Sequence, residues 1–172
     1  MKGIQTLFLA LPLMGLSQFS SADWIKDSAT QVEAKTIQLR HQIHQHPELG
    51  NMEFNTSKLV QKELKSYGIE VKTGFAKTGV IGVLKGALPG PVMALRADMD
   101  ALPVLENTGL SFASKTKALY QGKEESVMHA CGHDTHTAML LGAAKVLAAN
   151  KDKLAGTVVF VFQPAEEGAA DL

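Results

Sequence analysis

The sequence has little of several features that would indicate particular classes of protein. Cys131 is its only cysteine, so no disulfide can form within the chain. Its 17 basic and 17 acidic residues cancel, and it has no long basic run, which disfavours a surface for nucleic acid or anionic membrane. Beyond the N-terminus, no segment approaches the roughly 20 apolar residues of a membrane helix. These absences disfavour nucleic-acid-binding and membrane-spanning proteins.

The first 22 residues have the features of an export signal. Lys2 gives a positive charge, residues 4–16 are largely apolar, and residues 20–22 are small enough for cleavage. An uncleaved anchor is the alternative, but the apolar stretch is short for a bilayer and Pro12 interrupts it. We therefore expect residues 1–22 to be a signal peptide and the mature protein to be exported, periplasmic or secreted, with no stable membrane anchor after cleavage.

The lone cysteine needs an explanation in an exported protein, because a free exposed thiol outside the cytoplasm is open to oxidation. Taken alone, Cys131 would be interpreted as a buried structural cysteine. His129 and His133 on either side reverse that preference, because zinc and related metals accept thiolate, imidazole and carboxylate ligands. The cysteine therefore indicates a metal site.

Apolar residues at helical spacing predict three helices. Pro47 ends the first, Asn55 and Gly68 are the expected cap and stop of the second, and Asp134 is the expected cap of the third. The third is apolar on most sides, which predicts a buried helix. The expected helices cover residues 26–46, 56–67 and 134–149.

Four apolar runs predict strands, at residues 69–73, 79–84, 92–97 and 156–162. We expect a turn at residues 88–90 and an irregular stretch over 98–128. Helices that alternate with strands predict a layered α/β domain with a mainly parallel sheet flanked by helices. The unbroken apolar run at 156–162 is typical of a parallel strand that is covered on both faces. In such sheets, ligands lie at the carboxyl ends of the strands.

Two pairs of acids directly follow predicted strands and should lie at that edge: Asp98 with Asp100, and Glu166 with Glu167. Adjacent glutamates point in different directions, so one can bind a metal while its neighbour moves protons, as metal-assisted hydrolysis requires. A solvated loop tip is the alternative for the glutamates, but bare carboxylates beside a core are costly. Asp98 and Asp100 either form a turn or orient histidine ligands.

The histidines around the cysteine have a spacing that suits a metal. Gly132 lets Cys131 and His133 project from one side of an extended loop, and His129 shares their parity. His136, one helical turn after His133, either supports the ligands, faces the substrate or is a surface histidine.

A second histidine group, His41, His44 and His46, precedes Pro47. At positions i, i+3 and i+5 of a helix, these side chains do not share one tight face, so a zinc site made from the three alone is disfavoured. The favoured interpretation is a helix end followed by a turn through residues 47–50, although single members could still line a pocket.

Five blocks of the sequence are similar to those of one known family and follow in the same order. With these blocks, the chain resembles the zinc-dependent amidohydrolases of peptidase family M-twenty, in the branch of hippurate hydrolase, indoleacetyl-amino-acid hydrolases and N-acyl-amino-acid amidohydrolases. The resemblance implies an α/β catalytic domain with two divalent ions (zinc, manganese, nickel or cobalt) that hydrolyses the amide of an N-acyl amino acid or a similar small amide. The blocks are His44-Gln-His-Pro-Glu48, Thr78-Gly79-Val80, Leu95 to Pro103, Met128 to His136 and Gln163 to Gly168.

The resemblance also implies roles for single residues. Cys131, His133 and Glu167 match metal ligands, and Glu166 matches the general base. Asp98, Asp100 and Asp134 match acidic positions around this centre. The complete set of residues expected to support the ligands or face the substrate is Asp98, Asp100, Asp134, His129 and His136.

The chain also departs from the family pattern. Family members are longer, with a lid or dimerisation domain after the glutamate pair and two further metal-binding histidines, whereas no histidine follows His136. We therefore expect residues 23–172 to be the N-terminal part of a catalytic domain, with a partial metal site and no turnover; a homo-oligomer is expected of full-length members. The alternatives are a noncatalytic metal-binding or interaction module and, less favoured, a nucleophilic Cys131, which would not need the glutamate pair.

Overall fold

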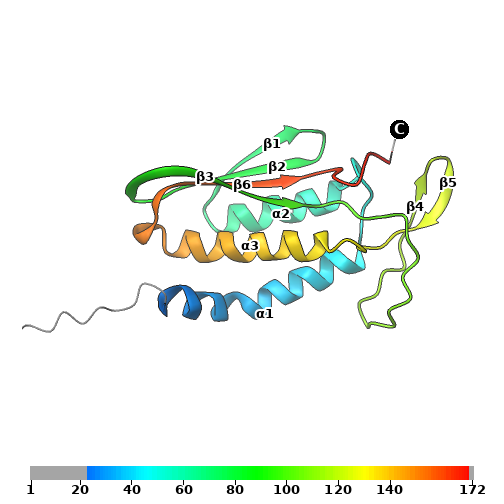
Figure 1. The fold of residues 1–172 in the computed structure, drawn as a ribbon, viewed down its shortest axis with the longest axis horizontal. Helices are drawn as coiled ribbons and strands as arrows, with labels where there is room; N and C mark the ends of the chain where they lie inside the picture. Colours follow the sequence, from blue (N-terminus) through cyan, green and yellow to red (C-terminus); the bar gives the residue numbers. More distant parts are fainter. Residues whose placement is uncertain (1–22, 171–172) are drawn as a thin grey trace, which may run out of the picture.

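The structure is a computed structural model that describes residues 23–170 (Figure 1). The expected signal peptide, residues 1–22, lies outside the described residues. Among the helices that are described, none combines the length and apolarity needed to cross a membrane. In chain order, the elements are α1 (Asp23–Gln45), α2 (Phe54–Ser66), β1 (Glu70–Phe75), β2 (Gly79–Lys85), β3 (Leu88–Asp98), β4 (Lys117–Tyr120), β5 (Lys123–Ser126), α3 (His133–Ala149), the 3-10 helix η1 (Lys151–Lys153) and β6 (Ala155–Gln163).

A four-stranded sheet lies at the centre, with the strands in the order β1, β2, β6, β3. The β1–β2 and β2–β6 pairs are antiparallel, and β3–β6 is the one parallel pair among the described strands. The predicted α/β class, with a sheet and flanking helices, is confirmed. The prediction of a mainly parallel sheet is wrong.

The error has its origin in the apolar run that forms β6. Val158, Phe160 and Phe162 are buried, and the residues between them are half-buried. In the described part of the chain, α2 and α3 cover one face of the sheet, while the other face carries apolar side chains without a covering helix (Figure 1). Apolar residues on both faces therefore hid the alternation that an antiparallel strand with one covered face normally shows.

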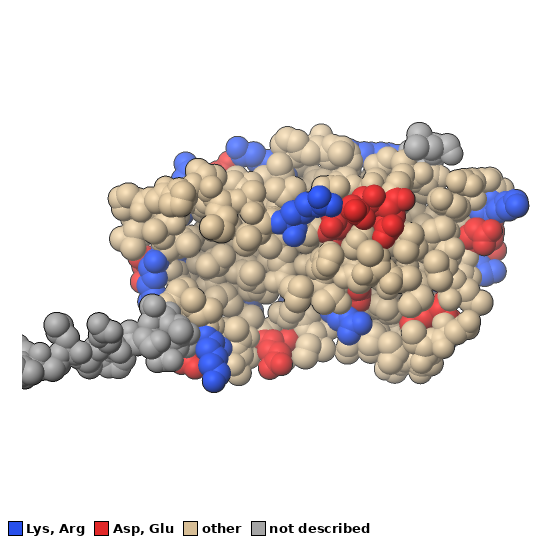
Figure 2. Space-filling model, in the orientation of Figure 1, with Lys and Arg blue, Asp and Glu red and all other residues tan. Residues whose placement is uncertain are grey.

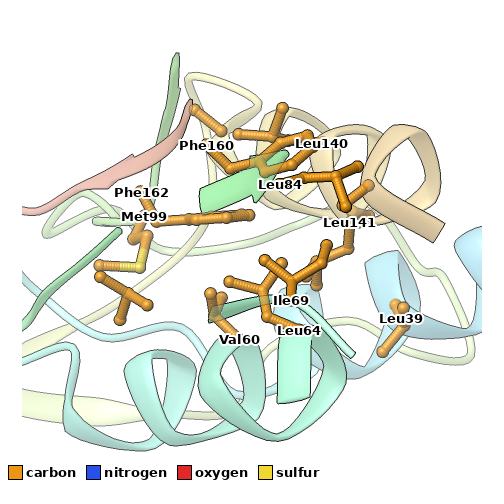
Figure 3. Packing of buried hydrophobic residues seen from close by; sticks show 14 of the residues in the cluster. Leu39, Val60, Leu64, Ile69, Leu84, Met99, Leu140, Leu141, Phe160 and Phe162 are labelled. Carbon is orange, nitrogen blue, oxygen red and sulfur yellow. The ribbon is translucent and has the colours of Figure 1, made fainter. Parts of the chain in front are cut away.

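The molecule has three layers: the sheet, then α2 and α3, then α1, which packs on α3 (Figure 1). Phe160 and Phe162 of β6 meet Leu64 of α2 and Leu141 of α3 in the core, and none of the four is more than 1% exposed (Figure 3). Each such side chain stabilises the fold by about 1.5–3 kcal/mol when buried. This core therefore fixes the positions of the strand ends that carry the candidate site.

The predicted helices agree with α1, α2 and α3 except at their first turns. Asn55 does not cap α2; instead, the carboxylate of Glu48 accepts the N–H groups of Asn55 and of the next residue, at 3.0 and 2.8 Å. Asp134 lies in the first turn of α3, and Gly132 is the N-cap. Gly68, with a φ of 74°, ends α2 as predicted, because glycine tolerates the left-handed conformation.

The stretch that was predicted as irregular contains a hairpin, β4–β5. Its two turn residues, Gln121 and Gly122, have φ of 49° and 79°, as a type I′ turn requires. The turn expected at residues 88–90 is instead the beginning of β3, where the register with β6 shifts before Val92.

Candidate metal centre

The carboxyl ends of β3 and β6 lie side by side and bring the two acidic pairs together. These strands are parallel, and Asp98 at the end of β3 pairs with Gln163 at the end of β6. Glu166 and Glu167 follow in the next turn. The first turn of α3 lies at the same edge, because Thr137 donates a 2.9 Å hydrogen bond to the carbonyl of Asp98. Figure 2 shows acidic side chains next to a basic one near these strand ends.

The three predicted metal ligands converge. Ligand atoms of Cys131, His133 and Glu167 all lie within 4.8 Å of one another. Nδ1 of His133 donates a 2.9 Å hydrogen bond to the carbonyl of Asp100, which leaves Nε2 with its lone pair for a metal. His133 is buried, whereas Cys131 and Glu167 are exposed, so the trio is open to solvent on one side. This donor set suits zinc and similar ions.

The protonation of Cys131 gives a further test of the fit. The hydrogen bond to Glu167 is the largest cause that raises the pKa of the Cys131 thiol, and some desolvation and the neighbouring carboxylates add to it. A raised pKa disfavours a free thiolate, and therefore disfavours the nucleophilic cysteine. A cation between the sulfur and the carboxylate would reverse the repulsion that causes the shift. The arrangement fits a metal site better than a thiol nucleophile.

A second trio, Asp98, His133 and His136, also has its ligand atoms within 4.8 Å of one another. It shares His133 with the first trio, and the single lone pair on Nε2 can serve only one ion at a time. Nε of Arg96 lies 2.8 Å from Oδ1 of Asp98, which places a positive charge beside the second trio. The first trio is therefore the better cation site.

Glu166 lies on the other side of the imidazole from the hydrogen bond to Asp100. Its Oε2 is 3.7 Å from Nε2 of His133, and its Oε1 is 3.9 Å from a terminal nitrogen of Arg96. Ala165 and Glu166 thus direct the chain so that Glu167 faces Cys131 while Glu166 stays beside the free imidazole nitrogen. This division is the one expected of a ligand and a general base, although the roles themselves stay predictions.

Asp100 contacts two members of the trio. Its Oδ2 accepts the N–H of Glu167 at 2.8 Å, and its Oδ1 lies 3.3 Å from Nδ1 of His133. The side chain is buried, and Oδ1 has no hydrogen bond of its own among the described residues. Asp100 therefore has the contacts of a residue that orients both a histidine and a glutamate ligand.

Asp134 does not point at the trio but at α1. Its Oδ2 accepts hydrogen bonds from Nε of Arg40 at 3.1 Å and from Nδ1 of His44 at 3.0 Å. Burial raises the pKa of Asp134, but the neighbouring His129, His44 and Arg40 lower it by a larger amount. The pKa of Asp134 is therefore below its usual value. Asp134 is the link between the first turn of α3 and α1.

His44 is the histidine that the sequence interpretation underrated. It is buried, and its second nitrogen, Nε2, lies 3.1 Å from Glu106, so the imidazole bridges two carboxylates. His41 stacks on Phe112 with ring centroids 3.7 Å apart, and His46 is exposed, as a helix end would have it. Asp134 and Glu106 hold His44 from distant parts of the sequence, and no local pattern predicts that the loop of residues 104–114 folds back onto it.

His129 and His136 differ in their surroundings. His129 is 4% exposed, and neither ring nitrogen has a hydrogen-bond partner in the described part of the chain. Burial lowers its pKa to about 4, so it is neutral at pH 7. His136 is half exposed, stacks on His133 at 5.4 Å, and has Nδ1 3.8 Å from Asp98. His136 is therefore open to solvent, whereas His129 belongs to the interior.

The sequence is similar to one family of known proteins. The model of Peptidase family M20/M25/M40 matches residues 94–171. Thermostable carboxypeptidase 1 of Saccharolobus solfataricus is 51% identical over 83% of this chain and 35% of its own length. N-acetyl-L-cysteine deacetylase of Bacillus subtilis is 48% identical over 81% of this chain and 32% of its own length, and hippurate hydrolase of Campylobacter jejuni is 52% identical over 76% and 31%.

A solved structure shows the same fold. It is the YXEP protein of Bacillus subtilis, described as a dinuclear metal binding peptidase from the M20 family, which is 45% identical with a TM-score of 0.70. The match covers 83% of this chain and 36% of that chain. The chain thus spans about a third of the length of these relatives.

Proposed function

Residues 94–171 match the model of Peptidase family M20/M25/M40, and we propose that the chain belongs to this family and carries part of the active site of a metal-dependent amidohydrolase. The substrates proposed are N-acyl amino acids or similar small amides, and the relatives named as a deacetylase and as hippurate hydrolase support this class. The observation that carries the proposal is the convergence of Cys131, His133 and Glu167 beside the second carboxylate of Glu166.

Cys131, His133 and Glu167 would hold a divalent ion, with zinc, manganese, nickel or cobalt as the candidates. When bound, such an ion supplies Lewis acidity, which polarises a carbonyl and makes water more acidic. Asp100 holds His133 and Glu167 in place through its carbonyl and its carboxylate. The protein therefore holds the metal ligands in position before the substrate binds.

Glu166 is the proposed general base. Its carboxylate lies beside Nε2 of His133 and is exposed, so it can accept the proton of an attacking water and then donate it to the amine leaving group. Arg96 lies 3.9 Å from Glu166 and 2.8 Å from Asp98, so a positive charge stands beside the proposed base.

Three protein ligands suffice for one ion, and two ions in the family's manner need donors outside the described residues. We therefore propose that this chain binds one ion and that turnover requires further ligands. A noncatalytic metal-binding module is the second candidate, and the solvent exposure of Cys131 and Glu167 favours it, because the site as described is open. Export, as expected from residues 1–22, is part of the same proposal.

One experiment separates these functions. The purified protein is titrated with zinc and then assayed for release of the amino acid from benzoyl-glycine and N-acetylcysteine, with and without the complementary segment of a relative. Cleavage that disappears in Glu166→Gln supports the hydrolase. Stoichiometric zinc binding without cleavage under either condition supports the module, and absence of zinc binding contradicts both.

A further inference from the structure

A buried acid that neither sequence motif nor comparison singles out binds the backbone of the turn that carries the glutamate pair. Glu53, which precedes α2, is 0% exposed. Its Oε2 accepts a 2.6 Å hydrogen bond from the hydroxyl of Thr78, and its Oε1 accepts a 2.8 Å hydrogen bond from the N–H of Ala165. A carboxylate in the interior is costly unless its oxygens are satisfied. Both oxygens of Glu53 are satisfied, and one of them by the turn that carries Glu166 and Glu167.

The residue that Glu53 holds has an unusual backbone conformation. Ala165 has a φ of 52°, in the left-handed region that residues other than glycine seldom adopt. Its N–H bonds to Glu53, and its carbonyl accepts the N–H of Gly168 at 3.3 Å. Such a conformation persists only where the surroundings hold it. The acceptor on Glu53 is therefore a direct restraint on the turn.

The turn has two carboxylate anchors. Glu53 binds the amide of Ala165, and Asp100 binds the amide of Glu167, two residues further along. Between these fixed amides lies Glu166. With both amides held, the Glu166 side chain is directed toward Nε2 of His133, and the Glu167 side chain is directed toward Cys131.

We propose that Glu53 is a positioning residue of the metal centre, which holds the positive-φ turn at Ala165 and so sets the directions of Glu166 and Glu167. The inference rests on the proposed function, since it concerns the same site. Glu53 touches neither ligand side chain and acts through the backbone alone. Burial raises its pKa, and the hydrogen bonds from Thr78 and Ala165 offset only part of that rise.

Two substitutions of Glu53 in the purified protein test this role, with cobalt(II) as the probe. Glu53→Leu fills the space but removes the acceptor, and it should weaken cobalt affinity by about 10- to 100-fold, as loss of a group that orients ligands does. Glu53→Gln keeps one acceptor oxygen for Ala165 while Thr78 can reverse its hydroxyl, so it should stay within about 3-fold of the unaltered protein. The absorption of the cobalt–thiolate bond should persist in Glu53→Leu, while the ligand-field bands should change, because Glu167 is displaced and Cys131 is not.

Glu63→Leu is the matched control. Glu63 is also a buried acid associated with α2, but its carboxylate binds Tyr67 and Lys35. It should lower stability and leave cobalt affinity and spectrum unchanged. If Glu53→Leu does not fold, Glu53→Asp replaces it, because its shorter side chain keeps the charge but does not reach Ala165, and it should lose about tenfold in affinity.

Unchanged affinity and spectrum in Glu53→Leu, or an equal loss in Glu63→Leu, would overturn the positioning role alone. A thiolate band in the unaltered protein without any amide cleavage, even when the complementary segment of a relative is added, would count against the proposed hydrolase and leave the positioning role standing. If the unaltered protein shows no thiolate band, both are overturned.

Discussion

Asp100→Asn is the substitution that tests the ligand arrangement most sharply. The carboxylate has one oxygen 2.8 Å from the N–H of Glu167 and the other 3.3 Å from Nδ1 of His133, which donates its proton to the carbonyl of the same Asp100. An asparagine offers one oxygen and one NH₂ group in place of two acceptors. Whichever way the amide is turned, its NH₂ faces a donor, either the N–H of Glu167 or the N–H of His133.

The size of the effect follows from these contacts. A hydrogen bond to a charged group contributes about 1.5–3 kcal/mol, and the amide either loses the hydrogen bond from Glu167 or sets its NH₂ against the N–H of His133, whose nitrogen lies 3.3 Å from the present Oδ1. Removal of a group that orients metal ligands typically costs about 10- to 100-fold in metal affinity. At about 1.4 kcal/mol per tenfold, that range is about 1.4–2.8 kcal/mol, which agrees with the first figure. We therefore expect zinc affinity to fall by about 10- to 100-fold.

The assay is competition for zinc between the protein and a chromophoric chelator at fixed pH. Asp152→Asn is the matched control, because Asp152 makes the same change of charge at an exposed position in η1. The reasoning is refuted if Asp100→Asn binds zinc as tightly as the unaltered protein, or if Asp152→Asn loses as much.

Three further predictions concern stability and the approach of two loops. Phe160→Ala should lower the free energy of unfolding by about 3–5 kcal/mol in urea titrations, because Phe160 is fully buried; a loss below about 1 kcal/mol would contradict the core described. Burial raises the pKa of Glu106, but its hydrogen bonds, including that from His44, bring it below 4.5. The unfolded chain therefore takes up this proton first, the ionised Glu106 stabilises the fold above pH 4.5, and its contribution is lost as the pH falls below that value. Glu106→Gln should accordingly lose stability less steeply than the unaltered protein on the acid side, and identical acid unfolding curves would argue against this. A Cβ at Gly50 would lie 1.9 Å from the carbonyl oxygen of Gly168, so Gly50→Ala should cost about 1–3 kcal/mol and weaken zinc binding; unchanged Tm and affinity would show that the two loops are not in contact.

Several parts of the fold could be predicted because they depend on neighbours in the sequence. Pro47 and Gly68 limit α1 and α2 through their own backbone constraints. The two acidic pairs could be placed at one edge because each follows an apolar strand. That inference needed only β3 and β6 to be parallel, and this is the one pair in the described sheet that is.

Other parts depend on residues far apart in the chain. Asn55 is a good cap by its chemistry, but Glu48 reaches the same N–H groups from the preceding segment. His44 has the sequence context of a helix end, and its two carboxylate partners come from positions 62 and 90 residues away. Glu53 is indistinguishable in sequence from a solvated acid, because its partner Ala165 lies 112 residues further on.

The central claim is that sulfur, imidazole and carboxylate at positions 131, 133 and 167 bind one divalent ion together. X-ray absorption at the zinc edge, on the protein loaded with one equivalent of zinc, measures this directly. The account predicts one sulfur neighbour at about 2.3 Å together with nitrogen and oxygen neighbours, and loss of the sulfur shell in Cys131→Ser. Zinc that is bound by nitrogen and oxygen alone in the unaltered protein, or no uptake of zinc by folded protein, would contradict it.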